Sequence, residues 1–388
     1  MSDLKELRAS IDAIDAQLVE LFRQRMSVAE QVAAYKTEHN LPVLDPERER
    51  AVIAAKTALA DTPEEKAELA KLYEELMSLS RARQRRRMDA CGSTADGSFR
   101  QYTHPCPPVE HPRVVYQGMP GAYSEAAAIR FFGEGVDSRG LNHFEDSFLA
   151  LERGEADYAV LPIENSTTGA IRQVHDLMGK YRFYMVGETT VRVNHCLMAL
   201  PGTTLEDIKT VYSHEQGLFQ SDRFLDAHPD WVRVPLLDTA GSAKFVRDSG
   251  DATKAAICSA RAAQVYGLHI LVEGTNHNGE NYTRFGVIRP RPELRPGSDK
   301  ITAVFTLPHQ SGSLHEILTI FAVNGLNLVK LESRPLPDRK WEYQFYVEFT
   351  GNLRAPGMDA VLRELDQSTA DFRIVGNYRA NLGDNDAV

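Results

Sequence analysis

An arginine interrupts the apolar face expected for a first helix over residues 4–38. The heptad positions of that face are Leu4, Leu7, Ile11, Ile14, Leu18, Leu21, Arg25, Val28, Val32 and Tyr35. A charge at a core position destabilises a fold by several kcal/mol unless it is paired. Arg25 is therefore expected to meet either a carboxylate of another helix, as a structural ion pair, or an anionic ligand.

Two further cations accompany Arg25. Lys36 follows it by about three helical turns and so points the same way. Arg8 lies about 25 Å from Arg25 along the helix axis and is rotated by roughly 100°. A small ligand cannot touch both on one helix, so a site that uses both must take Arg8 from a second chain. The long apolar seam also favours a dimer.

The stretch VLDPERER, residues 43–50, is expected to begin a second helix. Asp45 is suited to the N-cap, and Pro46 to the first helical position. Arg48 and Glu49 then fall in the first turns of this helix, one on each side of its inward face.

A third helix is expected to begin at a capping box, Thr62–Glu65. Its stripe turns polar along Leu69, Tyr73, Leu76, Ser80 and Gln84. The basic run Arg81–Arg87 suits the negative end of the helix dipole. The polar residues that could meet in one pocket are Arg8, Arg25, Lys36, Asp45, Arg48, Glu49, Ser80 and Gln84. Such a pocket suits a small dicarboxylate bearing a hydroxyl, and a rearrangement there needs only positioning and electrostatics.

Polar loops follow several of the strands expected in residues 113–290. They contain Ser124, then Glu164, Asn165, Ser166 and Gly169, then Ser213, His214 and Gln216, then Thr239 and Ser242. Each loop opens a helix, whose N-terminal N–H groups suit carboxylates. One such loop is usually ordinary capping, but four in a parallel-sheet domain point to a site at the carboxyl ends of the strands.

Composition and charge exclude several classes of function. The 388 residues carry a net charge of −10, which argues against nucleic acid or an anionic membrane as the main partner. No apolar run approaches the ~20 residues that span a bilayer. The N-terminus does not resemble a signal peptide, and the four cysteines show no zinc or CxxC spacing. We expect a cytoplasmic protein with no metal and, because no GxGxxG follows a strand, no nucleotide cofactor.

Composition also divides the chain. Residues 1–90 lack glycine and are predicted to be all helical, and residues 91–112 are a Gly-, Ser- and Pro-rich linker. Residues 113–290 alternate strands and helices. Residues 299–380 predict a ferredoxin-like βαββαβ sandwich. Its strands are expected at 301–307, 327–335, 341–350 and 372–378, with helices near 313–324 and 358–368.

The first 88 residues resemble the all-helical chorismate mutase family, because the polar positions within "LRASIDAIDAQLVELFRQRMSVAEQVAAYK" and "LPVLDPERE" match. The resemblance implies that Arg8 of a partner chain, Arg25 and Arg48 hold two carboxylates. It implies that Lys36 and Gln84 donate to an ether oxygen. Asp45 and Glu49 would hold the ring hydroxyl, with Ser80 nearby.

The central region resembles the prephenate dehydratase family in Gly-Ala-Tyr-Ser (121–124), Glu-Asn-Ser-x-x-Gly (164–169), Ser-His-x-Gln (213–216) and Asn-Tyr-Thr-Arg-Phe (281–285). The resemblance implies two lobes like those of periplasmic binding proteins, with residues 191–282 forming most of the second. Thr283 would donate to the departing hydroxyl, and Arg284 would either bind a carboxylate or bridge strands. The residues that would position the substrate are Asn165, Ser166, Ser213, Gln216 and Ser242.

The C-terminal region, residues 301–380, resembles the ACT regulatory domain. The matching pieces are SGSLHEIL (311–318) and LESRPLP (331–337), although Ser313 and His315 stand where small or apolar residues are usual. The resemblance implies an L-phenylalanine site at Gly312, Ser313, Leu314, Glu332, Ser333 and Arg334.

Taken together, the three regions resemble the bifunctional chorismate mutase–prephenate dehydratases. The resemblance implies conversion of chorismate through prephenate to phenylpyruvate, without a cofactor, by a homodimer or homotetramer under feedback by L-phenylalanine. Two alternatives remain: a mutase fused to a dehydrogenase, and a non-catalytic amino-acid sensor.

Overall fold

The computed structural model describes residues 3–39, 41, 43, 45–89, 102, 105–307, 309–310, 312–336 and 342–381. Most of the expected linker, 91–112, and the end of the second effector motif, Pro337, lie outside the described residues. The chain forms two compact units: Met1–Arg100 with Ile301–Ile374, and Gln101–Lys300 with Val375–Val388. No helix among the described residues is long and apolar enough to cross a membrane.

Three helices form the N-terminal part, as predicted: α1 (Leu4–Glu38), α2 (Pro46–Thr57) and α3 (Pro63–Asp89). Asp45 caps α2, because its carboxylate accepts from the backbone N–H of Arg48 at 3.0 Å. Thr62 Oγ1 likewise accepts from the Glu65 N–H at 3.1 Å, but the Glu65 carboxylate reaches the N–H of Asp61 and not that of Thr62. The capping box is therefore incomplete.

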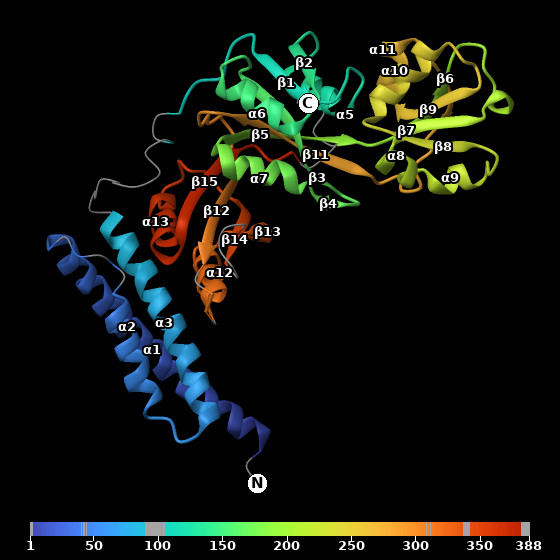
Figure 1. Ribbon diagram of the computed structural model, residues 1–388. Coiled ribbons are helices and arrows are strands. Elements are labelled where there is room, and N and C mark those ends of the chain that lie inside the picture. The colour runs from blue at the N-terminus through green and yellow to red at the C-terminus, as the bar shows by residue number, and fades with distance from the viewer. Residues whose placement is uncertain are drawn as a thin grey trace. The chain divides into compact units, whose positions relative to one another are not determined.

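The helix α3 packs against both α1 and α2 (Figure 1). The face of α1 that α3 covers contains the buried residues Met26, Ala29 and Ala33. The heptad seam itself stays uncovered within the chain, with Leu18 57 % and Leu21 61 % exposed. Rows of exposed large apolar side chains on this scale are typical of surfaces that interact with other proteins.

The C-terminal part is the predicted βαββαβ sandwich. Its elements are β12 (Lys300–Leu307), α12 (Ser313–Val323), β13 (Leu328–Pro335), β14 (Tyr343–Thr350), α13 (Met358–Ser368) and β15 (Ala370–Tyr378). The sheet order is β13-β14-β12-β15, the order of a ferredoxin-like fold. The edge strand β13 leaves Val329 and Leu331 exposed.

The central region has two sheets. The first, in the order β2-β1-β3-β11-β5, is built from β1 (Arg113–Gln117), β2 (Asp137–Leu141), β3 (Tyr158–Asn165), β5 (Tyr184–Arg192) and β11 (Tyr282–Arg289), with β4 (Gly169–Ala170) beside β3. The helices on it are α5 (Tyr123–Phe132), α6 (Phe144–Glu152) and α7 (Arg172–Tyr181).

The second sheet has the order β10-β6-β9-β7-β8. Its strands are β6 (His195–Ala199), β7 (Thr210–His214), β8 (Val232–Leu236), β9 (Lys254–Ser259) and β10 (His269–Glu273). Its helices are α8 (Glu215–Gln220), α9 (Asp222–Asp226), α10 (Thr239–Ser249) and α11 (Ala260–Tyr266), and η1 (Leu205–Asp207) is a 3₁₀ turn. The chain crosses between the two lobes twice, from β5 to β6 and from β10 to β11 (Figure 1).

The two sheets are mixed, which corrects the expectation of a parallel-sheet domain. In the first sheet β11 runs antiparallel to both β3 and β5, and in the second β6 runs antiparallel to β9. The reason is the double crossing: a strand that returns from the second lobe enters the first sheet from the opposite end. The amino end of β11 thereby meets the carboxyl end of β3.

We predict that Gly140→Ala destabilises the unit formed by Gln101–Lys300 and Val375–Val388 by about 1–3 kcal/mol, the usual range for overpacking. A Cβ at Gly140 would stand 2.0 Å from the carbonyl oxygen of Gly118, whose backbone cannot move aside without disturbing β1. The measurement is the urea midpoint of the full chain. Gly279→Ala is the control, because its nearest neighbour would be a side-chain nitrogen of Arg192 at 3.8 Å. Equal midpoints for both variants would contradict the packing argument.

Candidate active sites

Arg25 points from α1 to the last turns of α3. Its guanidinium donates to the carbonyl oxygen of Leu76 at 3.1 Å and to the hydroxyl of Ser80. Burial lowers the pKa of Arg25, opposed by the nearby Tyr73 and Glu49. The structural ion pair considered for Arg25 is therefore not its direct contact: among the residues described, the hydrogen bonds of Arg25 go to neutral groups, and Glu49 acts on it through space.

Lys36 lies three turns further along α1, beside the start of α2. Its ammonium donates to the carbonyl oxygen of Val43 at 2.6 Å. Burial lowers its pKa, and Asp45 and Glu49 act in the opposite direction. Since Glu49 interacts electrostatically with both Arg25 and Lys36, the structure brings this predicted set together around one carboxylate.

Arg81 is a residue of this site that the sequence reading missed. It was expected to be a cation suited to the end of a helix, but its side chain is only 6 % exposed and forms an ion pair with Glu49. Its two other nitrogens lie 3.7 Å from Glu316 on α12 and 3.7 Å from Glu364 on α13. A usable signal was its position, because Arg81 stands three residues before Gln84 on the same helix face.

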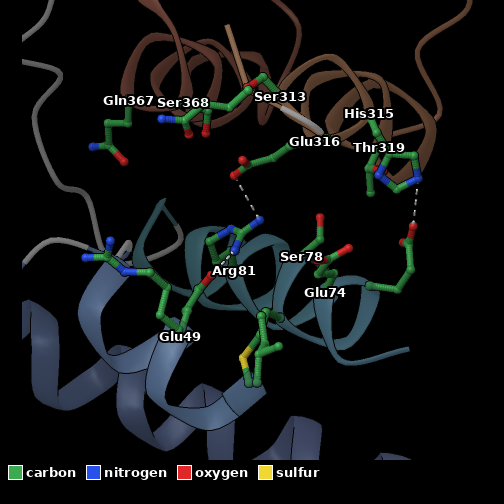
Figure 2. A pocket seen from close by; sticks show the side chains of 16 residues that line it. Glu49, Glu74, Ser78, Arg81, Ser313, His315, Glu316, Thr319, Gln367 and Ser368 are labelled. Carbon is green, nitrogen blue, oxygen red and sulfur yellow. Dashed lines mark hydrogen bonds and ion pairs between the residues drawn. The ribbon is translucent and has the colours of Figure 1, made fainter. Parts of the chain in front are cut away.

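Figure 2 shows Arg81 between Glu49 of α2 and Glu316 of α12, at a cavity of about 430 Å³. The cavity also takes in Gly312 and Ser313, two residues of the expected effector motif. The N-terminal helices and the βαββαβ sandwich therefore share a polar surface within one unit.

The remaining predicted residues of the helical site fall into two classes. Arg8, Asp45 and Arg48 are exposed in the single chain. Ser80 and Gln84 are buried, and Oε1 of Gln84 has no hydrogen-bond partner among the described residues. The polar set is thus partly exposed to solvent in the single chain.

A second cavity, of about 400 Å³, lies between the two lobes of the central region. Its walls come from the carboxyl ends of β1, β3, β7 and β8 and from the amino end of β11. Three of the predicted residues line it: Asn165, Gln216 and Thr283. Gly121 fixes the approach of the lobes here, because its φ is +90° and a Cβ would meet the Cα of Ala262 at 2.8 Å.

Thr283 is held by a hydrogen bond across the strands β3 and β11. Its Oγ1 accepts from Asn165 Nδ2 at 3.0 Å. Asn165 is itself fixed, because its Oδ1 accepts from the N–H groups of Thr167 and Thr168 and its Nδ2 also donates to Asn281. Since the threonine oxygen accepts here, its hydroxyl hydrogen can be donated into the cavity.

Four predicted residues do not line the cavity. The hydroxyls of Ser213 and Ser242 are buried on backbone carbonyls, of Ile257 at 2.7 Å and Asp238 at 2.9 Å. Ser166 bonds to the backbone of residues 280 and 282. Arg284 donates to Glu164 and Glu188 on the neighbouring strands, which is the bridging role considered for it.

Other polar residues of the cavity were not predicted. His195 contacts Gln220 Oε1 at 2.9 Å and Tyr123 Oη at 3.1 Å. Burial lowers the pKa of His195, so the ring is neutral near pH 7. Tyr123 belongs to the Gly-Ala-Tyr-Ser motif (121–124), which was a usable signal for it. His195 and Gln220 lie in no motif singled out in the sequence, so only the fold brings them into the cavity. His214 also faces the cavity. Its Nδ1 accepts from the Gln216 N–H, and this bond orients the loop.

The expected effector residues lie in two places of the sandwich. Gly312, Ser313 and Leu314 form the start of α12, where Gly312 has a φ of +91°. Glu332, Ser333 and Arg334 lie on the edge strand β13, and Lys330 lies 3.4 Å from Glu332. Among the described residues there is no group of His, Cys, Asp and Glu side chains that could hold a metal ion.

The chain is similar to known proteins over nearly its whole length. A family profile for prephenate dehydratase matches residues 114–293, and one for chorismate mutase type II matches residues 7–85. The bifunctional chorismate mutase/prephenate dehydratase of Pseudomonas aeruginosa is 32% identical over 382 residues, which cover 97% of each chain. That similarity spans both catalytic regions, and it favours neither the dehydrogenase fusion nor the non-catalytic sensor.

Two solved structures are similar over 69% of this chain. One is prephenate dehydratase from Arthrobacter aurescens in complex with L-Phe, at 30% identity and a TM-score of 0.62 over 90% of that chain. The other is described as GqqA, a novel type of quorum quenching acylase, at 32% identity and a TM-score of 0.64 over 98% of that chain. Given the full-length similarity, the chain belongs to the family of bifunctional chorismate mutase/prephenate dehydratases, and it is an enzyme with both activities.

Proposed function

We propose that the mutase reaction takes place at the polar set of α1, α2 and α3. Arg25 and Arg48, with Arg8 of the partner subunit, hold the two carboxylates of chorismate. Lys36 and Gln84 donate to the ether oxygen as charge develops there, and Asp45 and Glu49 hold the ring hydroxyl near Ser80. Donors fixed before the reaction stabilise developing charge without reorganisation. The observation that carries this proposal is the pairing of two half-buried cations with neutral groups: Arg25 and Lys36 keep their charge for an anionic ligand.

The uncovered seam of α1 supports a dimer, and with it the assignment of Arg8 to the partner subunit's site. In the single chain six large apolar side chains of this helix are more than half exposed: Leu4, Leu7, Ile11, Ile14, Leu18 and Leu21. A second copy of the same helix would cover them and bring an Arg8 to the polar set. The exposed Val329 and Leu331 of the edge strand β13 offer a further surface for assembly as dimer or tetramer.

We predict that Arg8→Ala and Arg25→Ala each lower mutase activity at least ~10²-fold, the scale for losing one transition-state donor. Dehydratase activity should persist. Mixing the two variants after subunit exchange should restore about a quarter of the wild-type mutase rate, because half of the dimers are mixed and each holds one intact site.

Arg23→Ala is the control, since Arg23 lies on the same helix with its side chain 74% exposed. It should behave as wild type alone and in mixtures. A mixture of the Arg8 and Arg25 variants that stays inactive would remove the partner's Arg8 from the site.

For the dehydratase reaction we propose that Thr283 donates its hydroxyl hydrogen to the departing ring hydroxyl of prephenate. Water and carbon dioxide then leave together and the ring becomes aromatic. Asn165 fixes the threonine oxygen, and Gln216 and the N-terminus of α8 position the substrate. The carrying observation is the bond from Asn165 Nδ2 to Thr283 Oγ1 at 3.0 Å inside the cavity. Ser213, Ser242 and Ser166 support these loops from outside the cavity.

Thr283→Val should stop phenylpyruvate formation while prephenate accumulates from chorismate. The substitution keeps the shape of the side chain and removes a donor, which lowers the rate by about 10²–10³-fold. Rates on prephenate and on chorismate are measured separately. The control is Thr168→Val in the same cavity, whose hydroxyl contacts Asn165 Oδ1 at 3.3 Å. A near-normal rate for the Thr283 variant would exclude it from the chemistry.

We further propose that the C-terminal sandwich is an ACT domain that binds L-phenylalanine as a feedback inhibitor, in a cytoplasmic enzyme. Its ferredoxin-like strand order supports this, together with Gly312, Ser313 and Leu314 at a helix N-terminus and Glu332, Ser333 and Arg334 on β13. From the sequence we expect L-phenylalanine to inhibit the dehydratase more than the mutase, because only the short segment 291–299 joins the sandwich to the dehydratase region. Arg81 changes that reasoning, because it contacts Glu316 and Glu364 of the sandwich beside the mutase set.

Glu332→Gln should raise the L-phenylalanine concentration for half-inhibition at least about fivefold, within the usual range of coupling effects, and leave both uninhibited rates unchanged. Both activities are titrated with L-phenylalanine. Asp359→Asn is the control, an exposed carboxylate at the start of α13. Unaltered inhibition of the Glu332 variant would move the effector site elsewhere.

A further inference from the structure

A buried glutamate of the dehydratase unit takes part in neither of the sites described above. Glu188 lies on β5 and is 3 % exposed. Its Oε1 accepts from Lys300 Nζ at 2.6 Å and from the Asn381 N–H at 2.9 Å, and its Oε2 accepts from Arg284 at 3.1 Å. Both oxygens of this buried carboxylate are hydrogen-bonded, so removing the charge of Glu188 would weaken all three contacts at once.

The donors on Oε1 mark the points where the C-terminal sandwich joins the dehydratase unit. Lys300 is the first residue of β12, and Asn381 comes three residues after the end of β15. The two chain segments are also tied to each other, by Asn377 Nδ2 to the Lys300 carbonyl at 2.9 Å and by the Ala380 N–H to Asp299 at 2.7 Å. Entry and exit of the sandwich therefore meet at one carboxylate of β5.

The donor on Oε2 leads to the active site. Arg284 bridges Glu188 on β5 and Glu164 on β3, with distances of 3.1 and 2.7 Å. In the strand register Arg284 faces Glu164, and the next pair along is Thr283 with Asn165. Successive side chains of a strand point to opposite faces of the sheet. The Arg284–Glu164 bridge and the Thr283–Asn165 pair are neighbours on the same two strands, so they lie on opposite faces of the sheet.

The bridge lies beside an irregularity in the backbone pairing of β11 with β3. The pairing of β11 with β3 shifts register between Arg284 and Phe285. An irregularity of this kind interrupts the ladder and re-aims the side chains beside it. There the Glu164–Arg284–Glu188 bridge, on the opposite face of the sheet, fixes the position of Thr283 relative to Asn165.

We propose that Glu188 is a positioning residue for Thr283 and the point through which the C-terminal sandwich acts on the dehydratase site. Through Arg284 it sets the geometry of the Asn165–Thr283 pair. Its contacts with Lys300 and Asn381 make its position depend on the two chain segments that attach the sandwich. The inference rests on the proposed roles of Thr283 and L-phenylalanine, and it adds the route between them.

Three variants of the full chain test this route. Glu188→Gln keeps the shape and removes the charge that holds Arg284 and Lys300. Lys300→Met releases only the attachment side and leaves the bridge to Glu164 in place. The matched control is Glu293→Gln: Glu293 is 1 % exposed in the same unit and accepts from Arg289, Arg295 and Tyr158, but these contacts lead to neither Thr283 nor Lys300.

The readouts are kcat and KM on prephenate, the mutase rate, and half-inhibition by L-phenylalanine. Glu188→Gln should lower dehydratase kcat at least about tenfold with KM within twofold, since small displacements of reacting groups have effects of this size. Lys300→Met should keep kcat within about twofold and raise half-inhibition at least about fivefold. Glu293→Gln should change none of these, although it lowers the unfolding midpoint as Glu188→Gln does.

Several results would overturn the inference. A Glu188→Gln enzyme with wild-type kcat would end the positioning role, and so would a Glu293→Gln enzyme with the same loss, which would indicate general loosening. Should Glu188→Gln not fold, Arg284→Lys decides, because lysine keeps the charge but lacks the planar fork with which arginine holds a carboxylate on each neighbouring strand. An unchanged kcat there would refute the role.

The failure of this inference can be told apart from failure of the proposed control. If L-phenylalanine inhibits the wild-type enzyme and inhibits Lys300→Met at the same concentration, the route through Glu188 is refuted while feedback itself stands. A wild-type chain that forms phenylpyruvate but ignores L-phenylalanine would refute feedback and with it the route. The positioning role would then stand or fall on kcat.

Discussion

The dehydratase site that we propose depends on the hydrogen bond between Asn165 and Thr283. It joins the last residue of β3 to the second residue of β11, two segments 118 positions apart in the chain. The bond exists because β11 returns from the second lobe antiparallel to β3. Every other feature of the first lobe, from the loop after β1 to the turn that fixes Asn165, holds that meeting point in place or surrounds it.

The mutase site that we propose depends on a different constraint: one chain does not supply enough surface to cover the apolar side chains of α1. Three helices bury Met26, Ala29 and Ala33 but cannot also cover the opposite row of apolar residues on α1. Arg25 and Lys36 are partly desolvated and donate to backbone and hydroxyl oxygens, and Arg81 forms an ion pair with Glu49. The half-site is therefore electrostatically prepared, while its exposed Arg8 depends on what covers the seam.

The local elements could be predicted from the sequence because each carries its own signal. The helix α1 and the cap Asp45–Pro46 agree with the expected positions, and so do the six elements of the sandwich within a few residues. Periodicity and capping are local properties, and they survive without knowledge of the fold.

The composition of the sites could be predicted only in part, because burial is a property of the whole fold. A serine at a helix start, such as Ser213 or Ser242, looks the same whether its hydroxyl faces a ligand or a backbone carbonyl; here both face carbonyls. Arg81 stood in a basic run typical of solvent and is buried, because Glu49, Glu316 and Glu364 approach it from three other elements. The antiparallel return of β11, which local patterns do not encode, decided which face of that strand Thr283 and Arg284 occupy.

The double crossing makes the second lobe an insertion whose ends nearly coincide. The N–H of Val193, where the chain leaves β5, donates to the carbonyl oxygen of Asn281, just before β11, at 2.8 Å. A module attached at a single place can swing as a body with changes confined to a few residues there, as in hinged domains. The pivot is also next to the chemistry, because the side chain of Asn281 accepts from Asn165 and Thr283 is two residues away. Because this hinge adjoins Thr283, opening and closing of the cleft would change the surroundings of the hydroxyl that we propose to react.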